Sequence, residues 1–473
     1  MSVQENWKPE KVFDSILETV GHTPMVRLNR VAKDISVNVL AKLESFNPGG
    51  SVKDRIGLAM IEAAERHGLI KPGYTIVEPT SGNTGLGLAL AARVKGYKVV
   101  FTMPDKMSAE KVNLLRAFGA KVIVTPTAVP ADHPGNYIKV AERIAREDPS
   151  SFMPNQYFNS ANPDAHYKTT GPEIWEQTDG RVDVLVAGMG TGGTISGIGR
   201  YLKEKNPDIR IIGVDPEGSM YHHEFYGTSG AIQTYKVEGI GEDFMPSTLD
   251  LKTVDEIIVV SDKDAFQTAR RLAAEEGIFA GGSSGAAVFA ALQVAKRLDG
   301  DKTIVAILPD TGRNYMTKIY SDAWMCEHGF METSDERILV EDILKSKSGT
   351  IENIISVRPD DRIETAVDLM MRHSVSQLPV VKDEMQVGSV SEKNLVERLC
   401  AQCGTRTSCG ERCESRIEQI MEPPLPSVGK TDRILNPFLL LRDRNAMVVM
   451  EGQRMVDVIT TIDVVNYLMG RAP

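Results

Sequence analysis

One segment of the chain joins a buried strand, a glycine-rich turn and a helix in immediate succession. The apolar run Val184–Ala187 predicts a buried strand, and Ile211–Val214 predicts the strand that follows the helix. This succession is typical of an α/β domain with a mostly parallel sheet. Between the two strands, the turn from Gly188 to Thr194 contains four glycines. Glycines at a helix N-terminus let backbone N–H groups approach a phosphate, so we expect a phosphate group to bind this turn.

Two classes of ligand fit the glycine turn. A Gly-x-Gly-x-x-Gly pattern begins at Gly188, and Asp215 follows where a dinucleotide site would place its ribose-binding carboxylate. The hydroxyls of Thr191 and Thr194 instead suit a terminal phosphomonoester, whose three oxygens accept more hydrogen bonds. The rest of the sequence favours the phosphomonoester. A nicotinamide-binding oxidoreductase stays as an alternative.

Composition excludes several classes of protein. A chain of 473 residues with 42% hydrophobic and 25% charged residues is globular and holds more than one domain. It contains no run of about 18 apolar residues, which a membrane span would need. The net charge of -10 argues against a nucleic-acid partner. Five cysteines do not make a secreted disulfide scaffold, and the N-terminus has no signal or transit character, so we expect a cytoplasmic protein.

The second part of the chain is an internal repeat. The segment Val387–Asn394 resembles Val456–Asp463 at an offset of 69 positions, and each lies in a strand–strand–helix unit. Two such units usually pack together, since neither buries its apolar face alone. The predicted division is a catalytic domain at 1–330, a charged linker at 331–350 and a tandem module at 351–473, with repeats at about 351–400 and 415–473.

Three further positions carry residues suited to chemistry. Lys53 lies at the predicted first turn of a helix, where the helix dipole disfavours its positive charge. Most lysines are simply solvated, but a lysine with a destabilised ammonium becomes nucleophilic at neutral pH. The turn Thr80–Thr84 offers hydroxyl and N–H groups that suit an α-carboxylate, or it is an ordinary capped turn. The turn Gly281–Gly285 is a third turn of this kind, and a flexible loop without a functional role explains it equally well.

Four spaced motifs together resemble the fold-type II pyridoxal-phosphate enzymes that replace a group on the β-carbon of an amino acid. The motifs are SVKDR at 51–55, PTSGNTG at 79–85, GTGGT at 190–194 and GGSSG at 281–285. The stretches at 155–175, 237–246 and 308–325 are more similar to the cystathionine β-synthase family than to cysteine synthases. The C-terminal repeats resemble the regulatory (Bateman) module of that family. The resemblance implies two α/β subdomains with mostly parallel sheets, followed by that module.

The resemblance also implies a role for each matching residue. Lys53 would carry pyridoxal 5'-phosphate covalently and act as the general base, Asn83 would bind the ring oxygen, and Ser283 would face the ring nitrogen. The residues expected to bind the cofactor's phosphate are Gly190, Thr191, Gly192, Gly193 and Thr194. Those expected to bind the substrate carboxylate are Thr80, Ser81, Thr84 and Gln156.

The reaction that the resemblance implies is a β-replacement. L-Serine and L-homocysteine would give L-cystathionine and water through an aminoacrylate intermediate, in a homodimer or a larger homo-oligomer. The alternative is a cysteine synthase that uses O-acetyl- or O-phosphoserine and sulfide, against which the segment Arg313–Lys318 argues. A catalytically inactive sensor of adenosyl nucleotides is a third alternative.

The sequence departs from the family pattern in several places. The short N-terminus has no cysteine, so we expect no haem, and Glu242 stands where vertebrate and yeast relatives have a tyrosine. In the second repeat, Thr460 and Asp463 match a ribose-binding pattern for S-adenosylmethionine or an adenine nucleotide. Asn394 of the first repeat accepts hydrogen bonds less strongly than an aspartate, so we expect at most one good adenosyl site.

An extra cysteine-rich stretch separates the two repeats. Its four thiols could bind a metal, but their spacing matches no familiar zinc pattern, so we favour free or redox-active thiols and expect no metal. The cysteines are Cys400, Cys403, Cys409 and Cys413.

Overall fold

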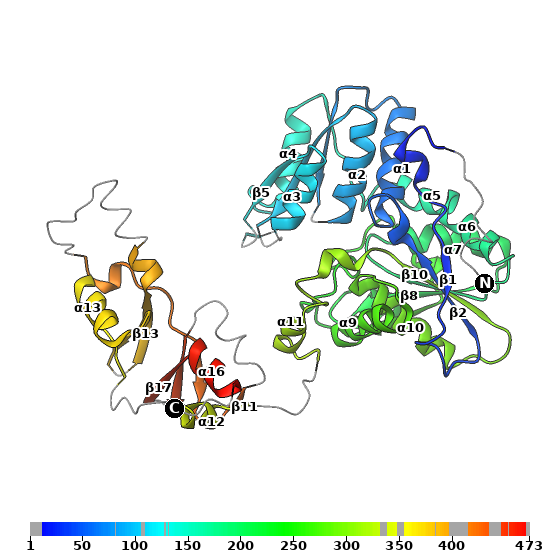
Figure 1. Ribbon diagram of the computed structural model, residues 1–473. Coiled ribbons are helices and arrows are strands. Elements are labelled where there is room, and N and C mark those ends of the chain that lie inside the picture. The colour runs from blue at the N-terminus through cyan, green and yellow to red at the C-terminus, as the bar shows by residue number, and fades with distance from the viewer. Residues whose placement is uncertain are drawn as a thin grey trace. The chain divides into compact units, whose positions relative to one another are not determined.

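The structure is a computed structural model, and the chain forms two compact units (Figure 1). The first unit comprises Met1–Met325 and Gly329–Met331, and the second comprises Cys326–His328 and Glu332–Pro473. No helix among the described residues is long and apolar enough to cross a membrane. The described residues are 12–80, 82–105, 109–126, 129–130, 132–331, 338–347, 354–383, 385–396, 415–434, 446–452 and 454–469.

A six-stranded sheet in the order β1-β2-β10-β7-β8-β9 forms the larger half of the first unit. All neighbouring strands are parallel except β1 and β2. The predicted strands at Val184–Ala187 and Ile211–Val214 are confirmed as β7 and β8, paired from Val184 and Arg210 onward. The strands are β1 (Met25–Arg27), β2 (Asn38–Leu43), β7 (Val184–Gly188), β8 (Arg210–Pro216), β9 (Glu256–Val260) and β10 (Thr303–Leu308).

Helices cover both faces of this sheet, as the buried side chains show. Val184 and Val186 pack in one apolar cluster with residues of α9 (Asp262–Arg271) and α10 (Gly282–Ala295). Leu185 and Ala187 point to the opposite face and pack with α6 (Thr170–Gln177) and α7 (Gly193–Lys205). Because alternate residues of a strand point to opposite faces, an uninterrupted apolar run is what a sheet covered on both sides requires.

A four-stranded parallel sheet in the order β5-β4-β3-β6 forms the other half of the first unit. Helices α1 (Lys53–Arg66) and α2 (Asn83–Val94) pack against it through a shared apolar cluster. The strands are β3 (Thr75–Pro79), β4 (Lys98–Pro104), β5 (Lys121–Thr125) and β6 (Ser151–Phe152). The other helices of this half are α3 (Ala109–Ala117), α4 (Tyr137–Glu147) and α5 (Ala161–Lys168).

Helices α1 and α2 approach each other as closely as two backbones can. A Cβ atom on Gly57 would lie 2.4 Å from the carbonyl carbon of Gly87. A Cβ atom on Gly87 would lie 2.4 Å from the carbonyl oxygen of Lys53. Since real Cβ atoms do not come this close, both positions require glycine for steric reasons.

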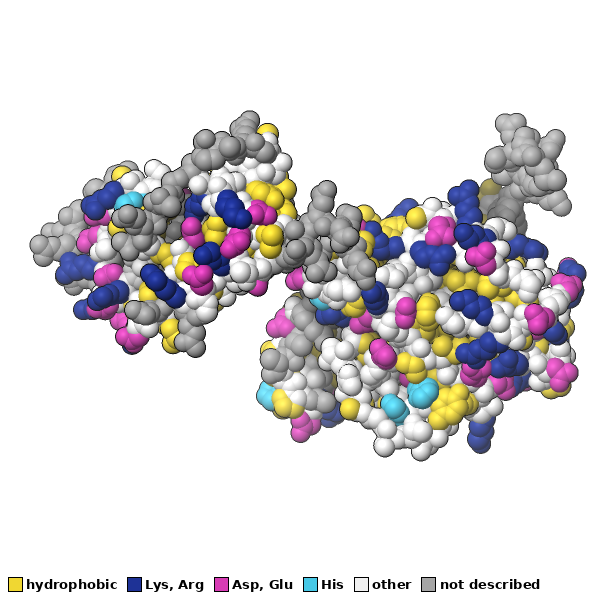
Figure 2. Space-filling view, turned by 90° about the horizontal axis from the view of Figure 1, so that it is seen from below, with side chains coloured by type: hydrophobic (Ala, Val, Ile, Leu, Met, Phe, Trp, Pro, Cys, Tyr) yellow, Lys and Arg dark blue, Asp and Glu magenta, His cyan; other side chains and the backbone are white. Residues whose placement is uncertain are grey.

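Short elements connect and complete the first unit. The remaining helices are α8 (Tyr221–Tyr226) and α11 (Asp322–Glu327). Single turns of 3-10 helix are η1 (Ile16–Thr19), η2 (Glu44–Phe46), η3 (Leu251–Thr253) and η5 (Gly312–Tyr315), and η4 (Leu272–Glu276) is a π-helical turn. Figure 2 shows acidic and basic side chains interspersed over the face that it draws, without an extended basic area on that face.

The second unit contains the repeat that the sequence predicts. Strands β12 (Gln377–Lys382) and β13 (Met385–Ser391) correspond at an offset of 69 positions to β16 (Ala446–Glu451) and β17 (Arg454–Thr460). Both antiparallel pairs also carry a register shift at equivalent residues, after Val380 and after Val449. Helical residues 392–396 follow the first pair and α16 (Thr461–Leu468) follows the second.

A further parallel strand completes each repeat. Val357 forms a parallel bridge with Val380, as β14 (Ser427–Gly429) pairs in parallel with β16. The first repeat also contains α13 (Ile363–His373). A short 3-10 turn, η6 (Ile417–Gln419), precedes β14.

The predicted linker at 331–350 is too long. Within it lie β11 (Ile338–Leu339), which pairs with β15 (Arg433–Ile434), and α12 (Val340–Lys345). Val340 and Ile343 are fully buried in a cluster of the second unit. The charged residues around them suggested a linker, but an apolar pair three positions apart marks one buried face of a helical turn.

Candidate active site

The glycine turn joins β7 to α7, and its shape depends on residues that carry no side chain. Gly192 precedes α7 with a φ of 80°, in the left-handed region. A Cβ atom there would lie 2.3 Å from Cβ of Leu249, and one on Gly190 would lie 2.4 Å from the carbonyl oxygen of Gly239. Neither position accepts a side chain, so only glycine lets the chain turn here and bring its backbone N–H groups to the N-terminus of α7, where a phosphate would accept from them.

Helix α5 orients the two threonine hydroxyls of this turn. The Asn162 amide donates to Thr191 Oγ1 at 3.0 Å, and His166 Nε2 lies 3.2 Å from Thr194 Oγ1. The other ring nitrogen of His166 lies 2.9 Å from Thr170 Oγ1. Burial, with the nearby positive charge of Arg55, lowers the pKa of His166 to about 3, so the ring is neutral at pH 7.

Neither Asn162 nor His166 stands out in the sequence as a residue of the site. Their spacing of four residues places both on one face of α5, where both reach the glycine turn. An amide and an imidazole four positions apart indicate a shared helix face. The sequence does not show that this face packs against α7, so the spacing alone does not identify a site.

Lys53 lines the same pocket as Gly190, Thr191 and Thr194 of the glycine turn. Burial lowers the pKa of the Lys53 ammonium, while the carboxylates of Asp310 and Glu242 oppose that shift. The lysine is thus more often neutral and nucleophilic than a solvated one. A wider hollow of about 550 Å³ beside Ala59 on α1 does not include Lys53.

A buried carboxylate that the sequence analysis missed orients Asn83. The Asn83 amide donates to Asp310 Oδ2 at 2.8 Å, and the Tyr315 hydroxyl donates to the same oxygen at 2.8 Å. The second Asn83 amide hydrogen is then available to another acceptor. Asp310 is 2% exposed, its Oδ1 has no partner among the described residues, and burial raises its pKa. Ser283 is buried nearby, on the first turn of α10.

The residues predicted to bind a substrate carboxylate meet at the start of α2, in a group that we call the carboxylate cradle (Thr80, Thr84 and Gln156). Thr80 Oγ1 accepts a hydrogen bond from the Gly85 N–H at 3.1 Å. The Thr84 hydroxyl donates to Gln156 Oε1 at 2.6 Å, and all three side chains are buried. Ser81 lies outside the described residues. Glu78 fixes the Gln156 backbone by accepting from its N–H at 3.0 Å.

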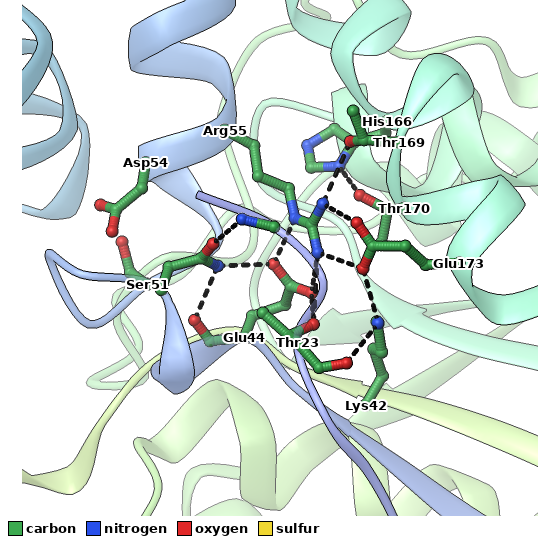
Figure 3. Close-up of polar contacts among 12 residues, drawn as sticks. Thr23, Lys42, Glu44, Ser51, Asp54, Arg55, His166, Thr169, Thr170 and Glu173 are labelled. Carbon is green, nitrogen blue, oxygen red and sulfur yellow. Dashed lines mark hydrogen bonds and ion pairs between the residues drawn. The ribbon is translucent and has the colours of Figure 1, made fainter. Parts of the chain in front are cut away.

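A buried ionic cluster anchors the helix that carries Lys53 (Figure 3). Arg55 forms ion pairs with Glu44 at 2.7 Å and with Glu173 at 2.6 Å, and Lys42 pairs with Glu173 at 2.7 Å. Burial alone would raise the pKa of Glu173, but hydrogen bonds and charges from Arg55 and Lys42 hold it at about 2. The cluster ties α1 to β2 and to α6, and it was not predicted from the sequence.

The dinucleotide alternative is wrong on the geometry of Asp215. This residue is fully buried, and its Oδ2 accepts a hydrogen bond at 2.9 Å from the His222 N–H at the start of α8. A fully buried carboxylate that accepts a hydrogen bond from the first turn of a helix does not reach the hydroxyls of a ribose. The phosphate that fits the turn is therefore not part of a dinucleotide held by Asp215.

In the second repeat, Thr460 and Asp463 contact each other. Asp463 Oδ2 accepts from the Thr460 N–H at 2.8 Å and from its hydroxyl at 2.6 Å, in a capping box at the start of α16. In the first repeat, the Asn394 amide donates to the Ile420 carbonyl at 2.6 Å. The four-cysteine stretch lies outside the described residues, which themselves contain no cluster of metal-binding side chains.

These residues fit pyridoxal phosphate. The glycine turn and its two hydroxyls match a terminal phosphate, Lys53 is an amine with a lowered pKa in the same pocket, and Asn83 has an amide hydrogen to donate. The fold and the site thus define a fold-type II pyridoxal-phosphate dependent enzyme. Residues 16–310 match the family model described as "Pyridoxal-phosphate dependent enzyme", and residues 340–401 match that of the CBS domain.

The chain belongs to the cystathionine β-synthase family. It is 42% identical over 484 residues to a cystathionine β-synthase of Oryctolagus cuniculus, covering 98% of this chain and 86% of the relative. It is 40% identical over 465 residues to that of Dictyostelium discoideum, covering 97% and 93%. Among solved structures, O-ureido-L-serine synthase is similar with a TM-score of 0.62 and 39% identity, over 69% of this chain and 98% of that one.

Proposed function

We propose that this protein condenses L-serine with L-homocysteine to L-cystathionine and water. The observation that carries the proposal is the pocket in which Lys53 faces the glycine turn beside a carboxylate cradle. The similarity to cystathionine β-synthases over nearly the whole chain supports this reaction. Pyridoxal phosphate, when bound, supplies an electron sink for the negative charge that develops at the substrate α-carbon.

The chain's own residues would bind, orient and transfer a proton. Lys53, as a neutral amine, takes the α-proton of serine and later returns it to the product. Thr80, Thr84 and Gln156 hold the substrate carboxylate, which keeps the α-carbon beside Lys53. Ser283 would hold the ring nitrogen of the cofactor through an uncharged hydroxyl, and such a partner favours β-elimination over transamination.

Product analysis tests the proposal directly. Purified protein with pyridoxal phosphate is incubated with serine and either homocysteine or sulfide, and separately with O-acetylserine and sulfide. We expect cystathionine from serine and homocysteine as the fastest reaction. Cysteine formed from O-acetylserine and sulfide, without cystathionine in the first mixture, would show a cysteine synthase instead.

For the second unit, we propose that Thr460 and Asp463 contribute to a site for S-adenosylmethionine or an adenine nucleotide. Unlike the fully buried Asp215, Asp463 is partly exposed, and Thr460 bonds to its Oδ2 alone, so the contact orients the carboxylate without burying it. Calorimetry with S-adenosylmethionine, AMP and ATP on wild type and Asp463→Asn protein tests it, and no heat from any of the three would refute it. The absence of haem, the cytoplasmic location and the homo-oligomeric state stay predictions.

A further inference from the structure

The segment 237–246 lies against the cofactor pocket and brings a carboxylate to its edge. Gly239 and Ile240 line the pocket together with Lys53. The Gly241 N–H donates to the carbonyl of Met189 in the glycine turn at 2.7 Å. Glu242 follows immediately, so its backbone is held next to the turn.

Ser219 fixes the Glu242 backbone from the other side. The Ser219 hydroxyl lies 3.1 Å from the Glu242 N–H and 3.2 Å from its carbonyl oxygen. The Met220 N–H donates to the same carbonyl at 3.1 Å. With its main chain held at both polar groups, Glu242 has only its side chain free to respond to a ligand.

One hydrogen bond holds the Glu242 side chain against Tyr157, the residue next to the carboxylate cradle. The Tyr157 hydroxyl donates to Glu242 Oε1 at 2.9 Å, and the Tyr157 ring packs edge-on against Phe244 at 5.0 Å between centroids. Tyr157 directly follows Gln156, whose side chain bonds to Thr84 of the carboxylate cradle. The Glu242 carboxylate is therefore tied to the residue that follows the carboxylate cradle, and its charge acts on Lys53.

Within the part of the chain that the structure describes, Glu242 forms no ion pair, and Lys53 supplies the only positive charge that favours its ionised form. Burial, together with the neighbouring Asp243, raises its pKa to about 7, against the Tyr157 hydrogen bond and the charge of Lys53. A half-buried carboxylate with an elevated pKa gains the most from a cation that arrives with a ligand.

We propose that Glu242, oriented by Tyr157, binds the α-ammonium group of the second substrate and so selects an amino-acid thiol over a thiol without an amino group. The inference rests on the proposed function, in which that thiol is homocysteine. Sulfide has no ammonium group to offer, so the contact favours homocysteine over sulfide.

The test compares three nucleophiles in the presence of serine. They are homocysteine, 4-sulfanylbutanoate, which is homocysteine without its amino group, and sulfide. For Glu242→Gln we expect kcat/KM for homocysteine to fall about 10- to 100-fold, the loss expected for one charge-assisted hydrogen bond. The values for the other two nucleophiles, and KM for serine, stay within about threefold because one missing contact affects only the ligand that makes it.

Asp243→Asn is the matched control, because it makes the same charge change at the adjacent, exposed residue. Because the charge of Asp243 raises the pKa of Glu242, its removal favours the ionised carboxylate, so we expect kcat/KM for homocysteine not to fall and the values for the other two nucleophiles to stay unchanged. An equal loss for the three nucleophiles in Glu242→Gln would overturn the proposal, since it would place Glu242 in a step common to all of them. An unchanged kcat/KM for homocysteine would overturn it as well.

Calorimetric titration of homocysteine without serine separates this inference from the proposed function. We expect an approximately 10-fold or greater weakening in Glu242→Gln and unchanged affinity for 4-sulfanylbutanoate. Equal homocysteine affinity in the two proteins would refute the ammonium site even if wild type makes cystathionine. A wild type that binds homocysteine through Glu242 but makes no cystathionine would refute only the proposed reaction.

Discussion

Replacing Arg55 with methionine tests whether the buried ionic cluster holds the lysine helix in place. Methionine keeps an unbranched apolar stem but removes the guanidinium that bridges Glu44 and Glu173. The Glu44 side chain is 0% exposed and that of Glu173 is 9% exposed, so neither carboxylate can turn to water. Lys42 still pairs with Glu173, whereas Glu44 loses its only ion-pair partner among the described residues.

The expected loss follows from leaving a buried charge without its partner. Removing one member of a buried ion pair destabilises a protein by about 3–5 kcal/mol. The surviving contact between Lys42 and Glu173 places the loss at the lower end, so we expect the free energy of unfolding to fall by about 3 kcal/mol at pH 7.

The same cluster predicts an acid dependence. The folded pKa of Glu173, about 2, lies below its ordinary value of 4.5. Its contribution to stability is therefore complete above pH 4.5 and is lost as the pH falls toward 2. In Arg55→Met the loss of stability over this interval becomes smaller, because one source of the lowered pKa is gone.

Urea unfolding followed by tryptophan fluorescence measures both effects. All three tryptophans of the chain belong to the first unit, so the signal reports on that unit. Arg66→Met at the exposed end of the same helix is the control, with an expected change within about 0.5 kcal/mol. A loss below about 1 kcal/mol in Arg55→Met, or equal losses in both variants, would refute the assigned role.

Three shorter predictions concern the pocket and its support. Lys53→Ala should abolish turnover while the far-UV circular dichroism stays unchanged, and measurable cystathionine formation by the pure variant would contradict its role. Thr194→Val removes a hydroxyl donor, so the dissociation constant of pyridoxal phosphate should rise about 10- to 100-fold in equilibrium dialysis. Gly57→Ala forces a methyl group onto the Gly87 backbone and should cost about 1–3 kcal/mol in urea unfolding, and an unchanged midpoint would show that the helices can separate.

Much of the fold and the glycine turn could be predicted because their signals are local. A buried strand, a turn that needs glycine and a helix start are adjacent in sequence, and Gly192 shows why no other residue fits. The repeats were visible for the same reason, as each copy of the strand pair preserves its pattern at a fixed offset.

The supporting contacts were not predictable because they join residues far apart in the chain. Asp310 meets Asn83 across more than 200 positions, and Arg55 meets Glu173 across more than 100. The sequence around an aspartate or an arginine does not show which distant residue it will contact in the folded interior. Asp215 illustrates the reverse error, since its position suggested a ligand whereas it accepts a hydrogen bond from the start of α8.

Because Gly57 and Gly87 let α1 and α2 pack in direct contact, Lys53 on one helix and the carboxylate cradle at the start of the other form one rigid unit. The Lys53 carbonyl rests against the helix whose first turn carries Asn83 and Thr84, so a movement of either helix carries the other with it. The spacing between amine and carboxylate site is then set once, during folding, and is the same for every first substrate. Glu242 lies outside that rigid unit, so a substitution at this position can change the contact with the second substrate without altering that spacing.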